Sequence, residues 1–432
     1  MTEDSMTGNE NKAAGKKLLV LGTSFGSVEI VQRAKARGIH TIVTDYYDTE
    51  HSLAKQYADE TWDISTSDLD ALEKKGREEK IDGVIASVSQ YNIEMQFRLA
   101  ERLGLPKYCT WDAWHYTRDK RDFKDLCIRN GVPVATDYYV SEALTDEELD
   151  KIQYPVAVKP VDQGGNAGIT FCHNHEEVRK AYAYARSVSE SPKVVIERFL
   201  DGVEYGGFYV LLNGESRLLC FWEMFNQEGE LNNIYSINVT LSRHLDQYLE
   251  EVDKPFRAAM KEGGYTNGVG WIETIRDKDG HFYVLEAGYR LSGEMLPAPI
   301  AEISGFDPVN WLIDTALGIE HTPEDLPAEQ KKPYEKLACS YMLWANRDGE
   351  LTEIRGLEEA AEKTGAQIDF LRLPGFEVKK NSPMGEALFT GNSAEEICDK
   401  IRTINETVSI RIKSGEDILV RFTDYDKLLT EK

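Results

Sequence analysis

The sequence predicts a protein of mixed α/β and α+β class, because its strand and helix signals change character along the chain. In the N-terminal part, short β-branched runs alternate with helical periodicity, which is typical of βαβ units around a parallel sheet. Between Gly206 and Glu286 strand signals dominate, apart from a helix near Leu245–Lys261. The last ~100 residues are expected to form a small α+β unit. The length of 432 residues agrees with about three domains.

The N-terminal part opens with a strand, a turn and a helix. The apolar run Leu18–Leu21 ends at Gly22, and the next helix, Ser27–Arg37, ends where Gly38 supplies a C-cap. The alternation continues, with strands expected at Thr41–Val43 and Val84–Val88 and helices at Ser67–Lys80 and Asn92–Leu103. This order predicts a Rossmann-like domain.

A second part is expected to begin near Tyr116. A helix at Arg118–Asn130 precedes strands at Val156–Lys159 and Val194–Glu197, and the polar, Pro-containing stretch Thr322–Lys332 is expected to be a linker. We therefore expect a disordered tail at 1–15, a Rossmann-like domain at 16–115, a central domain at 116–325 and a C-terminal α+β domain at 333–432.

Composition excludes several classes of function. The chain has 75 acidic and 50 basic residues, a net charge of −25, which argues against binding to nucleic acid or to an anionic membrane. No apolar run reaches the ~18 residues of a membrane span. Met1–Gly15 lacks an apolar signal core, so a cytoplasmic protein is expected. The six cysteines are widely spaced and are expected to be free thiols.

The segment Gly22–Ser27 follows a strand and opens a helix, and Asp45 ends the next strand. This placement is typical of a dinucleotide site, where a helix N-terminus holds phosphate and an acid holds ribose. Two of the three glycines of the fingerprint are missing. We therefore favour a turn that shapes a substrate cleft, with nicotinamide binding as the alternative.

A lysine and a glycine-rich loop follow the strand Val156–Lys159. Lys159 ends the strand and would present its charge at a cleft edge. The loop contains Gly164, Gly165 and Gly168, and such a loop can turn successive backbone N–H groups toward an anion. The alternative is a strand-end lysine beside a flexible hairpin.

The strand Val194–Glu197 leads into an irregular segment, Arg198–Glu204. The backbone around Phe199 and Leu200 could read an adenine edge, and Glu204 could accept hydrogen bonds from ribose hydroxyls. The alternative is an ordinary turn with a surface acid.

Asp279-Gly280 lies between β-rich runs and indicates a hairpin. If Lys278-Asp279 is a symmetric tip, Glu273 pairs with Val284. Glu286 is then the diagonal neighbour of Glu273 on the same face, at ~7–8 Å. Two carboxylates at that distance can hold Mg²⁺ between them. A one-residue bulge would put them on opposite faces.

Taken in order, these segments resemble the ATP-grasp superfamily over residues 16–320. The resemblance implies phosphate contacts for Lys120 and Lys159, a phosphate-covering loop at Gly164–Gly168, an adenine hinge at Glu197–Leu200, a ribose acid at Glu204, magnesium ligands at Glu273 and Glu286, and a catalytic arginine at Arg290. The family pattern Glu-x-Asn-x-Arg is broken at Gly288, where asparagine is usual. On sequence grounds Gly288→Asn is expected to be tolerated unless the site needs a positive φ.

The resemblance implies a Mg²⁺- or Mn²⁺-dependent enzyme that phosphorylates a carboxylate with ATP and couples it to an amine. Lys120, Lys159 and Arg290 would then be its catalytic cations. The C-terminal part is similar to that of L-amino-acid ligases and, more distantly, of biotin carboxylases. A homodimer is compatible with this resemblance. The alternatives are a scaffold that binds nucleotide without turnover, and a nicotinamide-dependent oxidoreductase. Expected substrate loops are Ser87–Asn92, Ser236–Ser242 and Arg290–Glu294.

Overall fold

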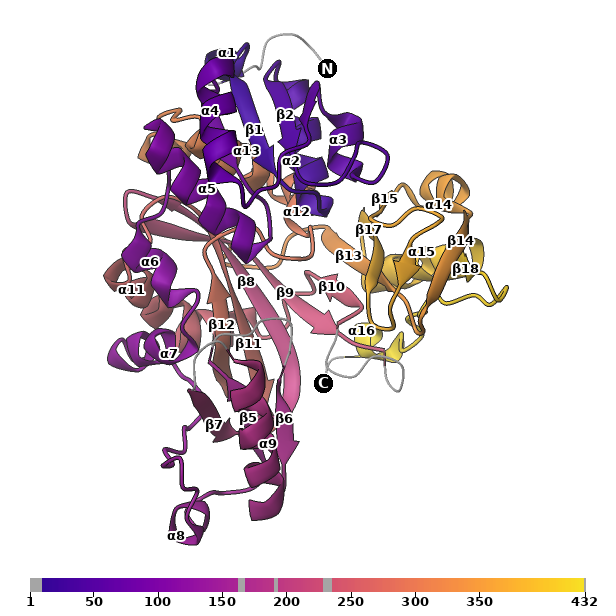
Figure 1. The fold of residues 1–432 in the computed structure, drawn as a ribbon. Coiled ribbons are helices and arrows are strands. Elements are labelled where there is room, and N and C mark those ends of the chain that lie inside the picture. Colours follow the sequence, from indigo (N-terminus) through magenta and orange to yellow (C-terminus); the bar gives the residue numbers. More distant parts are fainter. Residues whose placement is uncertain (1–9, 162–167, 190–192, 228–234, 431–432) are drawn as a thin grey trace.

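The computed structural model describes residues 10–161, 168–189, 193–227 and 235–430 (Figure 1). It confirms the mixed class, with a parallel N-terminal sheet, a large antiparallel central sheet and a small C-terminal α+β unit. Figure 1 shows the N-terminal part at the top, a small lobe at the bottom and the C-terminal part at one side. No helix among the described residues is long and apolar enough to cross a membrane.

The N-terminal sheet has the order β3-β2-β1-β4 and is parallel throughout. Its strands are β1 (Lys17–Leu21), β2 (His40–Thr44), β3 (Glu60–Trp62) and β4 (Gly83–Ile85), and its helices are α2 (Phe25–Ala36), α3 (Leu53–Tyr57), α4 (Leu69–Glu79) and α5 (Gln90–Leu103). Helix α2 begins two residues earlier than expected because the Ser24 hydroxyl caps it, accepting from the Ser27 N–H. Residues 10–13, expected to lie in a disordered tail, form the short helix α1 (Glu10–Ala13).

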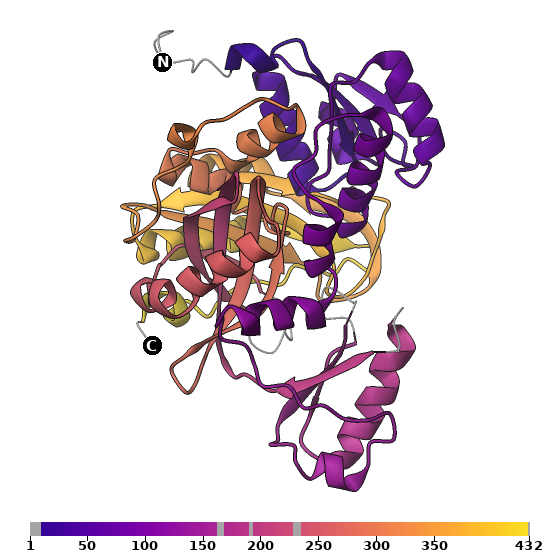
Figure 2. The same cartoon turned by 90° about the vertical axis from the view of Figure 1, so that its left-hand side faces the viewer.

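A small lobe follows the helices α6 (Trp111–Tyr116) and α7 (Lys120–Arg129). Its antiparallel sheet, β6-β5-β7, carries α8 and α9, and the bounds are α8 (Asp146–Leu149), β5 (Val156–Pro160), β6 (Thr170–Cys172), α9 (His175–Val188) and β7 (Val194–Arg198). Helix α9 starts where the Asn174 side chain accepts from the Glu177 N–H, as the capping pattern predicts. The lobe has a hydrophobic core of its own and projects from the molecule (Figure 2).

The large sheet has the order β12-β11-β8-β9-β10-β13-β17-β15. Its strands are β8 (Gly202–Leu212), β9 (Glu215–Phe225), β10 (Ile237–Val239), β11 (Gly268–Asp277), β12 (Phe282–Gly288), β13 (Leu337–Trp344), β15 (Gln367–Phe370) and β17 (Pro383–Gly391). Helices α10 (Leu245–Tyr248), α11 (Lys254–Glu262), α12 (Pro297–Ser304) and α13 (Pro308–Ala316) accompany it, with a π-helix at Leu249–Asp253 and a 3₁₀ turn at Pro323–Asp325. The C-terminal part therefore extends the central sheet.

The remaining C-terminal elements form a second layer. They are β14 (Gly349–Arg355), α14 (Leu357–Thr364), β16 (Glu377–Val378), α15 (Ala394–Thr407), β18 (Ser409–Ile412) and α16 (Asp426–Leu429). Helix α15 buries one face, including Ile397, Ile401 and Ile404, against β13 and β17. The expected divisions at 16–115, 116–325 and 333–432 stay a proposal.

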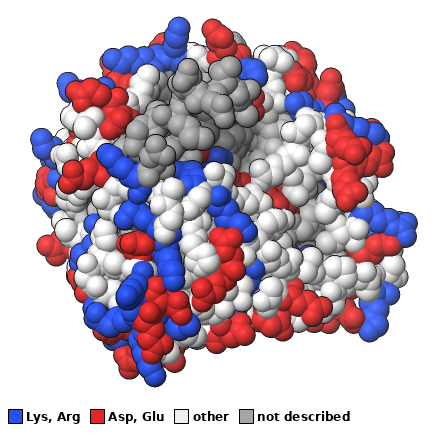
Figure 3. All heavy atoms as spheres, turned by 90° about the horizontal axis from the view of Figure 1, so that it is seen from above, with Lys and Arg blue, Asp and Glu red and all other residues white. Residues whose placement is uncertain are grey.

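Charged side chains of both signs are interspersed on the face seen from above (Figure 3). They do not gather there into one extended basic area, as a phosphate backbone would require. The six cysteines are all buried free thiols, in line with the expectation from their spacing.

Candidate active site

A cavity of about 1080 Å³ lies between the small lobe and one face of the large sheet. Its described lining includes predicted site residues from both sides: Lys120, Lys159, Glu197, Phe199, Leu200, Glu204, Glu273, Glu286 and Arg290. The fold thus brings these residues together from segments up to 170 positions apart along the chain (Lys120 to Arg290). Gly164 and Gly165 lie outside the described residues. Ligand sites are typically found at such junctions between structural units.

Glu273 and Glu286 are direct partners in the β11–β12 pair. The predicted register was wrong, because the tip is a three-residue loop with Gly280 in the left-handed region, so that Arg276 pairs with Phe282. A bulge at Leu285 then shifts the pairing by one more residue. The two shifts together restore the parity of side-chain direction, and both carboxylates lie on the same face.

Two adjacent carboxylates repel each other unless a cation lies between them. Burial, together with the charges of Glu286, Glu294 and Glu204, raises the pKa of Glu273 well above its usual range. The pKa of Glu204 is raised in the same way, by burial and by Glu286. Oxygen ligands from one or two carboxylates are what Mg²⁺ takes from a protein when a nucleotide supplies the rest. The donor set therefore fits magnesium.

Lys120 and Lys159 approach this pair from the lobe side. Lys120 is the first residue of α7, beside the N-cap Asp119, and its Nζ lies 3.8 Å from Glu286 Oε2. Burial lowers the pKa of the Lys120 ammonium, partly offset by the negative charge of Glu286. Lys159 projects from β5 and makes an ion pair with Glu197 on the neighbouring strand β7. Both ammonium groups therefore lie at the cavity wall, where phosphate groups could be held.

A buried network, which sequence analysis missed, holds Lys159 in place. Glu197 also accepts from Lys124 Nζ at 2.9 Å, and Lys124 donates to Asp137 at 2.5 Å. Burial would raise the pKa of Glu197, but the charges of Lys159 and Lys124 outweigh it and lower the pKa to about 2. Glu197 is thus a fixed anion between two lysines. Only the strand-end acid was visible in the sequence, because its partner Lys124 lies 73 positions away.

The segment predicted to bind adenine, Glu197–Leu200, begins at the end of β7. Phe199 donates its backbone N–H to Pro155 O at 3.1 Å, and its ring contacts Phe171 at 4.8 Å between centroids. Leu200 is buried, and the Glu204 side chain lines the cavity, which it reaches from β8. Gly168 has φ +79, and a Cβ there would lie 2.8 Å from Val188 Cγ2, so this position requires glycine.

The departure at Gly288 has a steric explanation. Gly288 is paired with Trp271, and a Cβ at Gly288 would lie 2.3 to 2.5 Å from three atoms of the indole. The expectation that asparagine is tolerated here is therefore wrong, and the obstacle is the ring rather than a positive φ. Arg290 stacks on the same ring at 4.9 Å and donates to Leu291 O at 2.6 Å. The indole thus occupies the space where an asparagine would begin and supports the arginine.

Tyr235 and Glu294 lie farther along the same cavity. Glu294 is buried and accepts from the Tyr235 hydroxyl at 2.9 Å, and Ser292 Oγ donates to its backbone carbonyl at 2.9 Å. Of these, only Glu294 and Ser292 fall in a loop predicted to face substrate. At another edge of the cavity, Arg243 pairs with Glu223 at 2.6 Å, a contact not foreseen from the sequence.

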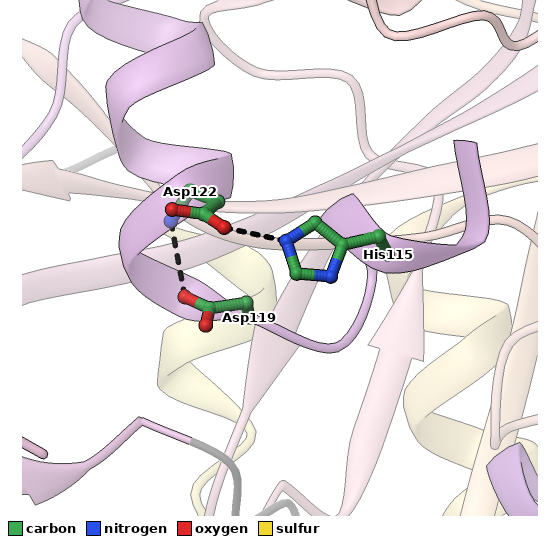
Figure 4. Close-up of side chains that lie close together, drawn as sticks. All are labelled: His115, Asp119 and Asp122. Carbon is green, nitrogen blue, oxygen red and sulfur yellow. Dashed lines mark hydrogen bonds and ion pairs between the residues drawn. The ribbon is translucent and has the colours of Figure 1, made fainter. Parts of the chain in front are cut away.

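A second group of metal-ligating side chains lies near the start of α7 (Figure 4). His115 Nε2 is 2.5 Å from Asp122 Oδ2, and Asp119 caps the helix by accepting from the Asp122 N–H. Each of these contacts is satisfied within the group, so an ion pair and a helix cap account for it. His173 is exposed and His175 lies 3.5 Å from Asp150, so these two histidines make no shared site.

The turn Gly22–Ser27 is absent from the described lining of the cavity. Asp45, the expected ribose acid, is buried, accepts from Ser52 Oγ at 2.8 Å and lies 3.3 Å from Lys55 Nζ. The hydroxyls of Ser24, Ser27 and Ser87 bond to one another instead. A ribose would have to displace these contacts, which weakens the nicotinamide alternative.

Comparison with known proteins agrees with this geometry. Residues 119–322 match the family described as the carbamoyl-phosphate synthase L chain, ATP binding domain. The chain is 26% identical over 340 residues to the 2-oxoglutarate carboxylase small subunit of Hydrogenobacter thermophilus, covering 72% of this chain and 69% of that protein. It is 24% identical over 416 residues to the formate-dependent phosphoribosylglycinamide formyltransferase of Sulfurisphaera tokodaii, covering 90% and 95%.

Solved structures share the fold. The L-amino acid ligase from Bacillus licheniformis superposes with a TM-score of 0.75 at 19% identity, covering 92% of this chain and 99% of that one. The biotin carboxylase domain dimer of Hydrogenobacter thermophilus 2-oxoglutarate carboxylase, in complex with MgADP and bicarbonate, has a TM-score of 0.74 at 21% identity, covering 92% and 91%.

The matched segment, residues 119–322, therefore carries an ATP binding domain of the ATP-grasp type. Both ligases and carboxylases stand among the proteins to which the chain is similar, and one of them was solved with MgADP.

Proposed function

We propose that this protein is a carboxylate–amine ligase that uses Mg-ATP to activate a carboxylate as an acyl phosphate and joins it to an amine. The observation that carries the proposal is the convergence of Lys120, Lys159 and Arg290 on a cavity whose floor holds the paired carboxylates Glu273 and Glu286. ATP phosphates bring about four negative charges. A protein with a net charge of −25 must offset them locally, and these residues would do so.

Each side chain has a separate task in this proposal. Lys120 and Lys159 bind phosphate oxygens from the lobe side, and the Phe199–Leu200 backbone with Glu204 holds the nucleoside. Glu273 and Glu286 would hold Mg²⁺, which supplies charge neutralisation at the phosphates when bound. Arg290, fixed on the Trp271 ring, faces the carboxylate to be activated. Since no covalent enzyme nucleophile is needed, positioning and charge account for most of the rate.

Two rivals remain under this fold. The first is a scaffold that binds nucleotide without turnover, which the replaced asparagine at Gly288 motivates. The second is a carboxylase, because carboxylases stand among the relatives.

A screen for phosphate release from Mg-ATP over pools of carboxylates and amines tests the proposal. Turnover that needs both a carboxylate and an amine supports a ligase. Turnover that needs bicarbonate instead would make the protein a carboxylase. Nucleotide binding with no turnover in any pool would favour the scaffold.

A further inference from the structure

Two acidic side chains lie next to each other where the small lobe joins the large sheet. The segment that follows α7 forms a single bridge to β7, which puts Asp137 opposite Glu197, and backbone hydrogen bonds flank the bridge on either side. Glu197 is 7% exposed, and the Asp137 side chain is 10% exposed. Two carboxylates so placed need cations beside them, because a buried charge without a partner is costly.

Two lysines supply these cations. Lys124, from α7, donates to Asp137 at 2.5 Å and to Glu197 Oε2 at 2.9 Å. Lys159, from β5, donates to the other oxygen, Glu197 Oε1. Burial would lower the pKa of the Lys124 ammonium, but the charges of Glu197 and Asp137 outweigh it and raise the pKa, so Lys124 is charged at neutral pH. The two ammonium groups and the two carboxylates therefore have no net charge.

The two lysines differ in their access to the large cavity. Lys159 and Glu197 line it, whereas Lys124 is absent from its described lining and lines a small adjoining pocket between α7, β7 and β12. Under the proposed function, nucleotide phosphates enter the large cavity and compete with Glu197 for the Lys159 ammonium. Glu197 cannot follow, because its backbone is paired within β7. It would then be a buried anion beside a second acid, with Lys124 as its remaining cation.

We propose that Lys124 is a positioning residue, which keeps Glu197 neutralised and so leaves Lys159 able to donate to nucleotide phosphates. The inference rests on the proposed function, because it takes over the phosphate contact of Lys159. With Lys124 present, phosphate competes with a carboxylate that already has a second cation. Without Lys124, Asp137 and Glu197 would outnumber Lys159, and a net negative charge would lie next to the phosphates.

The test is equilibrium binding of Mg-ADP to the full-length protein, measured by calorimetry, with Tm recorded for each variant. Lys124→Met keeps the length of the side chain and removes its charge. It should weaken Mg-ADP binding by about tenfold or more, as for the loss of a charged hydrogen bond. Lys124→Arg keeps the charge and should bind Mg-ADP more tightly than Lys124→Met.

Two further variants separate this role from damage to the fold. Asp137→Asn breaks the same network but leaves Lys124 to Glu197 alone, so it should bind Mg-ADP at least as tightly as the wild type. Glu197→Gln removes the carboxylate that needs Lys124. Adding Lys124→Met to Glu197→Gln should therefore cost less affinity than Lys124→Met costs in the wild type, which a double-mutant cycle measures.

Lys55→Met is the matched control. Lys55 is a buried lysine with two acidic partners, 3.3 Å from Asp45 and 2.8 Å from Asp63, and it is absent from the described lining of both pockets. Its loss should lower Tm and leave the Mg-ADP affinity unchanged. A lower affinity in Lys55→Met equal to that of Lys124→Met would show general damage and overturn the inference.

Three other results would overturn it. They are wild-type Mg-ADP affinity in Lys124→Met, an equal loss of affinity in Asp137→Asn, and an equal cost of Lys124→Met in both backgrounds. Lys159→Ala, measured in the same way, separates the inference from the contact on which it rests. If Lys159→Ala weakens Mg-ADP binding and Lys124→Met does not, the inference fails while the Lys159 contact stands. Failure of the ligase proposal appears separately, in the phosphate-release screen.

Discussion

Gly288→Asn restores the residue usual in the family and is expected to harm this protein. The strands β11 and β12 hold Gly288 directly opposite Trp271. The new Cβ would lie 2.3 Å from Cε2, 2.4 Å from Cζ2 and 2.5 Å from Nε1 of the indole, whereas carbon contacts are favourable at about 3.5–4.0 Å. Because both backbones are hydrogen-bonded in the sheet, the indole must rotate away.

That rotation has two costs. Overpacking of this kind lowers the free energy of unfolding by about 1–3 kcal/mol, which corresponds to a fall in Tm of roughly 2–10 °C. The indole also supports Arg290 at 4.9 Å and donates to Leu291 O at 3.3 Å, so the arginine loses its platform. We therefore expect the Gly288→Asn variant to have lower turnover and no tighter binding of Mg²⁺.

The assay combines thermal denaturation with a Mg²⁺ titration of nucleotide binding and of turnover. Gly214→Asn is the control, because Gly214 has open space around its Cβ position and a φ of +81 that asparagine adopts. The double variant Trp271→Ala/Gly288→Asn should recover Mg²⁺ binding relative to Gly288→Asn, since removing the ring makes room for the amide. Wild-type Tm and Mg²⁺ dependence in Gly288→Asn would refute the reasoning.

Four further predictions concern the same cavity. Mg-ATP at ~100 times its Kd should stabilise the protein by about 2.7 kcal/mol in a melting experiment, and NAD should not. Lys159→Ala should lower kcat by about two to three orders of magnitude with an unchanged far-UV spectrum, while Lys120→Ala should chiefly raise the KM for ATP; wild-type kinetics in Lys159→Ala would remove it from the site. Glu286→Gln should nearly abolish Mg²⁺-dependent turnover while nucleotide still binds, and an unchanged Mg²⁺ titration would show that Glu286 is not a ligand. Burial raises the pKa of Glu386 to about 8, so stability should fall as pH rises from about 4.5 to 8, where the folded state keeps a proton that the unfolded state has released. Glu386→Gln should flatten that fall in Tm, and an unchanged pH profile would contradict the pKa assignment.

The elements were predictable because their signals are local. The apolar run Leu18–Leu21, the β-branched run in Val194–Glu197 and the capping pair Asn174 and Glu177 are each recognised from neighbours a few residues away. The same is true of the paired carboxylates, since Asp279-Gly280 alone marks a hairpin between them. The family model and the shared fold confirm the superfamily that these motifs predicted.

The register and the supporting contacts were not predictable, because they are set across strands. Loop length at the hairpin tip depends on Gly280 taking a left-handed conformation, and the bulge at Leu285 depends on packing against β11. The network of Lys124, Asp137 and Glu197 joins three separate segments. No periodicity within one segment can reveal such contacts.

Twice in the large sheet a tryptophan packs over a glycine of the neighbouring strand, a contact that the sequence does not reveal. Trp271 lies over Gly288, and Trp222 lies over Gly206 with only 2.0 Å to a would-be Cβ. In both cases a large side chain and a glycine face each other in adjacent strands. A glycine inside a strand pattern indicates a close approach, but the sequence does not identify the partner.

Charge is distributed unequally along the cavity, and this distribution gives the proposed reaction a direction. Lys120, Lys159 and Arg290 lie around the end proposed to hold phosphates, whereas Glu294 lines the cavity beside Tyr235. Glu273, Glu286 and Glu386 of the large sheet share one face because alternate residues of paired strands point the same way. Under the proposed function, the three cations would stabilise an anionic acyl phosphate at the phosphate end. The carboxylate to be activated would then lie beside Glu273 and Arg290.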